Sequence, residues 1–374
     1  MNAAVAELKK ENFSNVFHEI YKKKNTSRHE IARNLNLSLP TVSQNLEALE
    51  EMRLIEKDGY YKSTGGRPAV IYKCNERAKV AVGIELLPRG ANIALIDLYG
   101  NAYAEKMINL MFSNNIEYYS KLGKEINGFI HSNISDTSIV LGVDMAIPGI
   151  IAEDNEHVSY AEVLKTGNLL LSDFSQHIDY PCGFFHDAEA SAAAELWHGE
   201  GMNNSIYIIL NNFFCSALIL NGKIQRSNGL SSGTLEHLVL HEGGRKCYCG
   251  KNGCVDAYCS AISLMSRAGT SNLDDFFLDL RNGDGKAVQL WDSYLNDLAL
   301  AIDNARMIIG CDVVIGGLIQ RYITEKDINI LKEKILNITT FKNADFTLKK
   351  GVFGKKAAMT GAALPRIEKF LSGI

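Results

Sequence analysis

No apolar run in the sequence approaches the length of a membrane span, which excludes a protein built from membrane-crossing helices. The first twelve residues are polar, so we expect no secretory leader. Short-period repeats and low-complexity segments are also missing, and this argues against a repeat architecture. Apolar residues make up 46% and charged residues 22% of the 374 positions. These values are typical of a globular protein with two or three domains.

An excess of charge of one sign is lacking as well. The net charge is −4, which by itself gives no indication of nucleic acid binding. Its distribution is more informative, because residues 1–75 hold 12 Lys and Arg against 9 Asp and Glu. Residues 1–75, the head, are thus mildly basic, whereas the rest of the chain is acidic. This is a weak indication that the head contacts phosphate groups.

Eight cysteines are present. Without a secretory leader we expect reduced thiols in the cytoplasm. Three of these cysteines follow a histidine in the pattern H-x9-C-x-C-x4-C, formed by His237, Cys247, Cys249 and Cys254. Coincidence or a redox-active Cys-x-Cys pair are the alternatives, but one imidazole and three thiolates match a closed tetrahedral zinc site. We therefore predict one structural Zn²⁺ per chain, with no open position for catalysis.

Residues 1–75 predict a winged helix-turn-helix. Apolar residues recur at helical spacing over 13–20. Ser27 and Glu30 form the signature of a capping box at the start of a second helix, and Ser38 can cap a third. A β-hairpin with strands at 60–62 and 69–72 is expected to follow as the wing.

The third helix and the wing carry the residues that we expect to contact double-stranded DNA. Short polar side chains at the start of a helix suit the base edges of a major groove, and a cationic loop suits a phosphate or an A·T minor groove. The alternative is a helical hairpin used only for oligomerisation. The candidates are Thr41, Ser43, Gln44 and Asn45 on the helix, and Gly66, Arg67 and Pro68 in the loop.

After a linker at 75–79 the pattern becomes α/β. Apolar runs at 80–84 and 91–97 predict a hairpin, and a strand at 139–146 runs into Ile147, Pro148 and Gly149. Strands at 206–210 and 215–220 begin a second, similar unit. We expect two related α/β halves with a cleft between them.

Three stretches together resemble the ROK family of repressors, open reading frames and sugar kinases. They are the winged head ending in Gly65-Gly66-Arg67-Pro68, the strand ending in Ile147-Pro148-Gly149, and the His237/Cys247/Cys249/Cys254 cluster. The resemblance implies a cytoplasmic dimer or tetramer with an actin-like, two-lobed sugar-kinase fold. Members with a winged head are transcription factors for carbohydrate genes.

The resemblance also implies a division of the chain. Residues 1–75 would form the DNA-binding head, and 76–374 the ROK domain. Its first lobe would take in 80–190 together with a C-terminal helix at 355–373. The second lobe, at 190–350, would hold the zinc site.

This sequence departs from the kinases of the family at both phosphate loops. The first, which resembles D-x-G-G-T in kinases, contains Leu86, Leu87 and Pro88 here, which fill the space that a glycine turn leaves for phosphate. The second contains Phe213 and Phe214 where a nucleotide would lie. We therefore expect no kinase activity and no enzyme, with a divergent ATP site as the alternative.

The sugar site is partly kept. Asp187 aligns with the general base of the kinases and has His186 as its neighbour, although it could simply cap the following helix. Thr234 replaces a sugar-contacting Glu of the motif G-E-x-G-H, and Glu195 is expected to be a solvated helix residue. The candidate effector contacts are Gly149, His186, Asp187, Thr234, His237 and Asp256, the last in place of a Glu.

The sequence therefore predicts a transcriptional regulator, a repressor of carbohydrate uptake or breakdown genes that a sugar or sugar derivative releases from DNA. One alternative is an active sugar kinase with a fused DNA-binding head. Another is a regulator that responds to a protein partner instead of a sugar.

Overall fold

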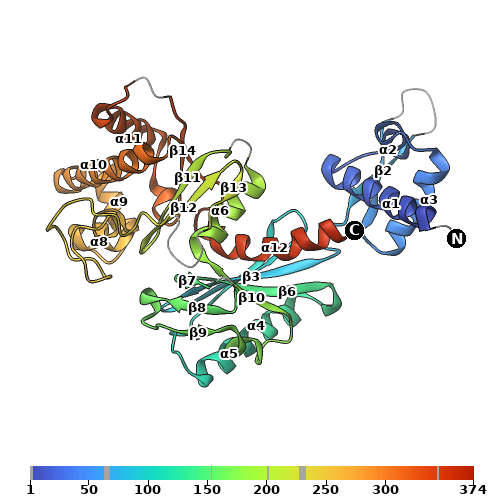
Figure 1. Ribbon diagram of the computed structural model, residues 1–374, viewed down its shortest axis with the longest axis horizontal. Helices are drawn as coiled ribbons and strands as arrows, with labels where there is room; N and C mark the ends of the chain where they lie inside the picture. The colour runs from blue at the N-terminus through green and yellow to red at the C-terminus, as the bar shows by residue number, and fades with distance from the viewer. Residues whose placement is uncertain (1–2, 63–67, 153, 200–201, 227–232, 343–344) are drawn as a thin grey trace.

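The computed structural model describes residues 3–374 except 63–67, 153, 200–201, 227–232 and 343–344. A helical head lies to one side of a body with two α/β lobes (Figure 1). Within the described part of the chain, no helix is long and apolar enough to cross a lipid bilayer.

The head has three helices and a two-stranded antiparallel wing: α1 (Ala3–Lys23), α2 (Arg28–Leu35), α3 (Leu39–Glu51), β1 (Ile55–Tyr60) and β2 (Val70–Cys74). The predicted capping box is confirmed, because Ser27 and Glu30 bond each other's backbone amides. Ser38 caps α3 by accepting from the amide of Thr41. The first wing strand begins earlier than predicted, since Ile55 already pairs with Cys74 and is buried.

The first lobe is built on a five-stranded sheet with the order β10-β6-β3-β4-β5. The predicted hairpin is confirmed as antiparallel β3 and β4, while β6 and β10 run parallel to β3. Its elements are β3 (Val80–Leu87), β4 (Gly90–Ile96), β5 (Ala102–Ile108), α4 (Ile116–Asn133), η1 (Thr137–Ile139), β6 (Val140–Ile147), α5 (Leu171–Ser175) and β10 (Cys182–His186). A small second sheet packs at its edge, formed by β7 (Ile150–Ile151), β8 (His157–Tyr160) and β9 (Leu169–Leu170), with η2 (Glu162–Leu164) between the last two.

The second lobe repeats this topology, as two related halves would. Its sheet has the order β13-β12-β11-β14-β15, with an antiparallel hairpin on one side of β11 and parallel strands on the other. The strands are β11 (Ser205–Leu210), β12 (Phe214–Leu220), β13 (Lys223–Ile224), β14 (Asp312–Gly316) and β15 (Leu348–Lys350). The helices are α7 (Asp256–Cys259), α8 (Ala261–Ala268), α9 (Leu273–Arg281), α10 (Gly285–Ile308), η3 (Ile319–Tyr322) and α11 (Glu325–Ile338).

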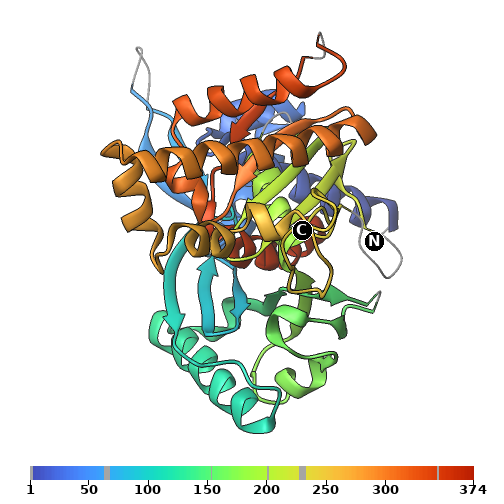
Figure 2. The same cartoon turned by 90° about the vertical axis from the view of Figure 1, so that its left-hand side faces the viewer.

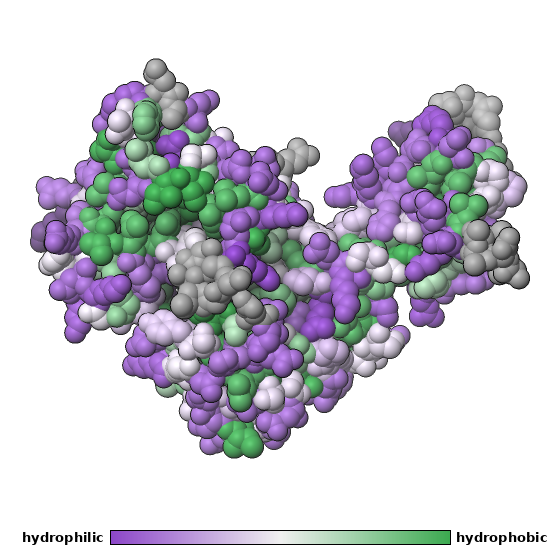
Figure 3. Space-filling model, in the orientation of Figure 1, coloured by the Kyte–Doolittle hydropathy of each residue, from purple (hydrophilic) through white to green (hydrophobic). Residues whose placement is uncertain are grey.

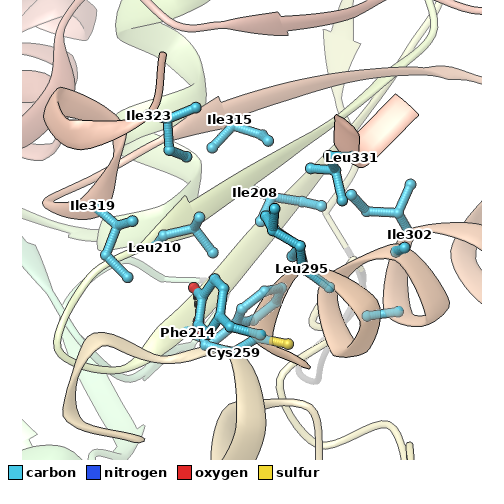
Figure 4. Close-up of a cluster of buried hydrophobic side chains, with 14 of the residues drawn as sticks. Ile208, Leu210, Phe214, Cys259, Leu295, Ile302, Ile315, Ile319, Ile323 and Leu331 are labelled. Carbon is cyan, nitrogen blue, oxygen red and sulfur yellow. Dashed lines mark hydrogen bonds between the residues drawn. The ribbon is translucent and has the colours of Figure 1, made fainter. Parts of the chain in front are cut away.

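The core of the second lobe lies between this sheet and the long helix α10. Ile208 and Leu210 of β11 and Ile315 of β14 meet Leu295 and Ile302 of α10 there (Figure 4). Burial of such side chains stabilises the fold by about 1.5–3 kcal/mol each. The opposite face of the sheet is covered by α6 (Asp187–His198).

Two helices connect the lobes. The helix α6 contacts β12 and β13 of the second sheet as well as β6 and β10 of the first. The last helix, α12 (Ala357–Gly373, after η4, Gly354–Lys356), packs on α6 and on β3 and β6. The approach is close: a Cβ on Gly361 would lie 1.6 Å from the carbonyl oxygen of Ala190, so only glycine fits. In the view of Figure 2 the second lobe stands above the first, with the head behind.

The head shares a core with the first lobe. Phe17 and Ile20 of α1 belong to the same buried cluster as Ile96 of β4 and Ile367 of α12. On the side shown in Figure 3, an open notch separates the head from the second lobe. The head is therefore fastened to the first lobe and to α12, and the division of the chain at residue 75 stays a prediction.

Candidate functional site

The predicted metal ligands lie together. One ligand atom from each of His237, Cys247, Cys249 and Cys254 falls within 4.8 Å of all the others. The sulfurs of Cys249 and Cys254 are 3.8 Å apart, and Nδ1 of His237 is 3.7 Å from the sulfur of Cys247. Two sulfurs that each lie about 2.3 Å from a tetrahedral zinc ion would be separated by about 3.8 Å. The donor set and its spacing therefore fit a metal ion.

Tight turns shape this cluster. Gly253 has φ +84°, and a Cβ there would lie 1.8 Å from the carbonyl oxygen of His241. A backbone hydrogen bond joins the two ends of the segment that carries the ligands: the amide of Leu240, just after His237, donates to the carbonyl of Gly253, just before Cys254. With Nδ1 facing the sulfurs, His237 retains Nε2 as a second ring nitrogen.

Four carboxyl groups from the two lobes act on one another electrostatically: Glu85, Glu236 and Asp256 are buried, and Asp187 is half-buried. Glu85 lies on β3, and Asp187 lies in the first turn of α6. Glu236 precedes the first metal ligand in the sequence, and Asp256 follows the last one. Burial raises the pKa of Asp187 to about 7 and that of Asp256 to about 6. It also raises the pKa of Glu236 to about 8, with further contributions from the charges of Asp187 and Asp256. The pKa of Glu85 rises to about 7 through burial, in spite of a hydrogen bond from Asn92, with the charge of Asp187 adding to the rise.

Asp187 is the first residue of α6 and not its cap, so the interpretation as an N-cap is wrong. His186 holds the cap position, without a side-chain hydrogen bond to the helix. The carboxylate of Asp187 accepts from the amide of Ala188, and Nε2 of His186 lies 3.5 Å from it. Burial and the positive charge of Arg226 lower the pKa of His186, which favours the neutral ring.

The remaining effector candidates are placed as follows. Asp256 begins α7 and accepts from the amide of Phe214 at 2.7 Å. Thr234 is half-buried in the turn before the metal cluster. Gly149 follows β6 and packs against Tyr160 of β8, whose pKa is raised by burial and by charges that include Cys247 and Cys249. The small sheet of the first lobe thus lies near the metal cluster of the second.

Glu236 was missed by sequence reasoning. In the motif G-E-x-G-H, Thr234 stands at the position of the glutamate and was interpreted as the loss of a carboxylate. Glu236 stands at the position of the second glycine and so brings a carboxylate back two residues later. The signal was available, because an acidic residue stands where the family pattern has glycine. Tyr248 was also missed: its ring packs edge-to-face on both His237 and Phe213.

At the two positions of the kinase phosphate loops, the structure places apolar side chains in or against hydrophobic clusters. Leu86 is fully buried in the core of the first lobe, and β3 turns directly into β4 at Pro88 and Arg89. Phe214 is buried in the second lobe, and Phe213 packs on Tyr248.

The prediction that Glu195 is solvated is wrong. Its side chain is 3% exposed and accepts hydrogen bonds from the amides of Val352 and Phe353 and from the hydroxyl of Tyr207. The reason is that α6 lies between the lobes, so even a late position on this helix faces protein. Glu195 joins α6 to the segment that leads into α12.

The DNA-contact candidates are only partly free. Gln44 is exposed on α3, whereas Asn45 donates to the carbonyl of Thr41 and Ser43 accepts from Arg28. Pro68 is exposed, and Gly66 and Arg67 lie outside the described residues.

An aromatic junction between head and body was not predicted. Tyr21 of α1 stacks on Tyr99 of the turn after β4, with ring centroids 4.5 Å apart. The Tyr21 hydroxyl donates to the carbonyl of Leu98, and the Tyr99 hydroxyl donates to the carbonyl of Tyr21. Trp197, near the end of α6, donates to the carbonyl of Tyr99. One helix therefore extends from Asp187 in the carboxyl cluster to the head junction.

Comparison with known proteins agrees with this architecture. A winged helix-turn-helix DNA-binding pattern matches residues 15–56, and the ROK family pattern matches residues 81–367. The chain is similar to the xylose repressor of Caldicellulosiruptor bescii, 27% identical over 64% of this chain and 61% of that protein. It is also similar to the DNA-binding transcriptional dual regulator NagC of Escherichia coli, 25% identical over 64% of this chain and 60% of that protein. The matches thus span about three fifths of these relatives.

Among solved structures, the fold resembles that of a ROK family transcriptional regulator described as a homologue of the Escherichia coli MLC protein. The TM-score is 0.74 at 21% identity, covering 97% of this chain and 96% of that one. The pattern match over residues 81–367 covers most of the sequence. The chain therefore belongs to the ROK family and carries an N-terminal winged helix-turn-helix.

Proposed function

We propose that this protein is a cytoplasmic transcriptional repressor of carbohydrate uptake or breakdown genes, which a sugar or sugar derivative releases from DNA. The observation that carries the proposal is one chain that joins a winged helix-turn-helix head to a cluster of carboxyls beside a histidine and three cysteines suited to a metal ion. The relatives similar in sequence are named repressors and regulators.

The proposed mechanism has two states. An effector bound by the carboxyl cluster contacts both lobes, and so favours one angle between them. Because the head shares its core with the first lobe, it moves with that lobe. In a homodimer or homotetramer, such a movement changes the separation of two recognition helices, which must match half-sites about 34–36 Å apart.

The zinc ion that we propose is structural. His237, Cys247, Cys249 and Cys254 would hold it, and four protein ligands leave no position for water activation. Its contribution would be to fix the turn that carries Thr234 and Glu236 and to orient the ring of His237.

The proposal is tested in two steps with the zinc-loaded chain. Thermal unfolding is measured against sugars and sugar phosphates, because a ligand at a hundred times its Kd stabilises the fold by about 2.7 kcal/mol. DNA selected from a random pool is then titrated with and without each ligand that stabilises the fold. A sugar that weakens DNA binding supports the proposal; DNA binding that no sugar alters contradicts it.

Two variants locate the DNA contact. Gln44→Ala should weaken specific binding by about 1–3 kcal/mol, the value of a base-edge contact. Gln176→Ala, an exposed glutamine of the first lobe, is the matched control and should leave DNA binding unchanged.

The kinase alternative is tested by a coupled assay for ADP release with the same sugars. The protein-partner alternative is tested by capture from lysate without added sugar, followed by measurement of DNA binding with the captured partner present.

A further inference from the structure

The third helix of the winged helix-turn-helix is acidic. The helix α3 carries Glu47, Glu50 and Glu51 and contains no lysine or arginine. DNA presents rows of negatively charged phosphates, so a carboxylate that approaches it is repelled unless it accepts a hydrogen bond there. A glutamate on the DNA-facing side of this helix therefore needs a donor among the bases.

Glu47 is exposed in the middle of α3. Among the described residues it forms no hydrogen bond and no ion pair. The cations on the neighbouring elements are engaged elsewhere: Lys57 of β1 pairs with Glu50 at 2.8 Å, and Arg28 of α2 donates to Ser43 at 3.1 Å. The carboxylate of Glu47 is thus available to a ligand.

Glu47 lies on the same face of α3 as Gln44, the exposed candidate for a base contact. The buried residues Val42, Leu46 and Leu49 form the opposite face. Positions three apart on a helix are neighbours, and at about 1.5 Å per residue these two are separated by about 4.5 Å along the axis. The rise between base pairs is similar, about 3.4 Å. Since α3 lies on the side of the head that is turned away from the body (Figure 1), the two side chains can face neighbouring base pairs in one major groove.

The chemistry of a carboxylate selects one base. An ionised carboxylate only accepts hydrogen bonds. In the major groove guanine presents the acceptors N7 and O6 and thymine presents the acceptor O4, so both repel it. Adenine presents its N6 donor beside the N7 acceptor, which suits the amide of Gln44 better. Cytosine presents its N4 amino group without an acceptor of its own beside it, so cytosine is the base that matches Glu47.

We propose that Glu47 determines part of the DNA sequence that this protein recognises, by accepting a hydrogen bond from the N4 amino group of a cytosine. That cytosine lies one or two base pairs from an adenine contacted by Gln44. The inference rests on the proposed function, because it names a base that the same DNA-binding head recognises.

The test is selection of DNA from a random pool by the full, zinc-loaded chain, followed by titration of the selected site. Each selected half-site should contain the cytosine and the adenine. Replacement of the cytosine by thymine, with its paired base, should weaken binding by the parent chain about tenfold, as expected of one base-edge contact. Gln44→Ala should remove the preference for adenine one or two base pairs away.

Variants assign the preference for cytosine to one residue. Glu47→Gln should change the preferred base from cytosine to adenine, because a glutamine amide matches N6 and N7 of adenine, and Glu47→Ala should leave no preference there. In both variants the exchange of cytosine for thymine should weaken binding by less than about threefold. Glu51→Gln is the matched control: it removes the same charge from the exposed last residue of α3 and should keep the preference for cytosine. Circular dichroism establishes that each variant is folded.

The outcomes separate this inference from the proposed function. If a folded Glu47→Gln keeps the preference for cytosine, or raises the affinity for all sequences equally, Glu47 is a solvated residue; the inference is then overturned and the proposed function stands. The same holds if the affected position is not a cytosine, or lies more than two base pairs from the position that Gln44→Ala affects. If the parent chain enriches no sequence from the pool, the proposed function and the inference both fail.

Discussion

The junction between head and body allows a prediction of measurable size. Tyr21→Phe and Tyr99→Phe each remove one hydroxyl that donates to a backbone carbonyl across this junction, at 2.7 Å and 3.0 Å. The stacked rings remain, so the change is confined to the hydrogen bonds. Each variant should lower the free energy of unfolding by about 0.5–1.5 kcal/mol, the net contribution of such a bond.

The measurement is calorimetric unfolding of the full chain. The head, first lobe and α12 share one core, so they should unfold together. For a unit of that size, 1 kcal/mol corresponds to a shift in Tm of about 2–4 °C. Because the two tyrosines are stacked and hydrogen-bonded to each other, the shift of the double variant should depart from the sum of the two single shifts.

Tyr60→Phe is the matched control, since this head tyrosine is 67% exposed. Its Tm should remain within experimental error of the parent chain. If the junction variants unfold at the same temperature as this control, the two hydroxyls do not hold the head on the first lobe. A coupled movement of the head and the first lobe would then have no support from these hydrogen bonds.

Three further predictions follow from the site. One zinc ion per chain should be released when the thiols are blocked, as measured with a colorimetric chelator; Cys247→Ser should abolish this release, whereas Cys182→Ser, outside the cluster, should not. For Asp187, burial raises the pKa from 3.8 to about 7, so the folded chain keeps a proton that the unfolded chain has lost. The free energy of unfolding should therefore fall as the pH rises from about 4 to about 7. Asp187→Asn should reduce this fall when the free energy is measured by urea unfolding at each pH. The same dependence on pH in the variant and the parent chain would contradict the role given to Asp187. Glu195→Gln should lower the free energy of unfolding by about 1.5–3 kcal/mol, because a buried carboxylate that accepts from three donors is replaced by an amide. The control is Glu242→Gln at an exposed glutamate, and an equal Tm for the two variants would refute this prediction.

Local features were predictable from the sequence. The caps at Ser27 and Ser38 depend on residues three positions away, and the buried face of α3 follows from its helical period. The metal cluster was equally accessible, because its ligands lie within one short segment with recognisable spacing. The hairpin of β3 and β4 follows from apolar runs around a turn.

Features that depend on distant segments were not predictable. Glu195 looks like a solvated helix residue until Val352 and Phe353 are brought against it from 157 and 158 positions away. Tyr21 and Tyr99 belong to different predicted domains, and neither has a neighbour in sequence that indicates a junction. The burial of Glu236 depends on how its turn folds against the rest of the second lobe. In the sequence, the only indication was that an acidic residue stands at a glycine position of the family motif.

The position of α12 has a consequence for the order in which the molecule can be completed. Met359, Ile367 and Leu371 fill the same core as residues of α1 and β4, more than 250 positions earlier in the chain. Since a growing polypeptide emerges from its N-terminus, the head and first lobe are synthesised long before the helix that closes their core. These long-range contacts favour slow completion of the fold. On the proposed function, a response to an effector should therefore arise only after the last helix has been made, and truncation within this helix should leave the head without the core that it shares with the first lobe.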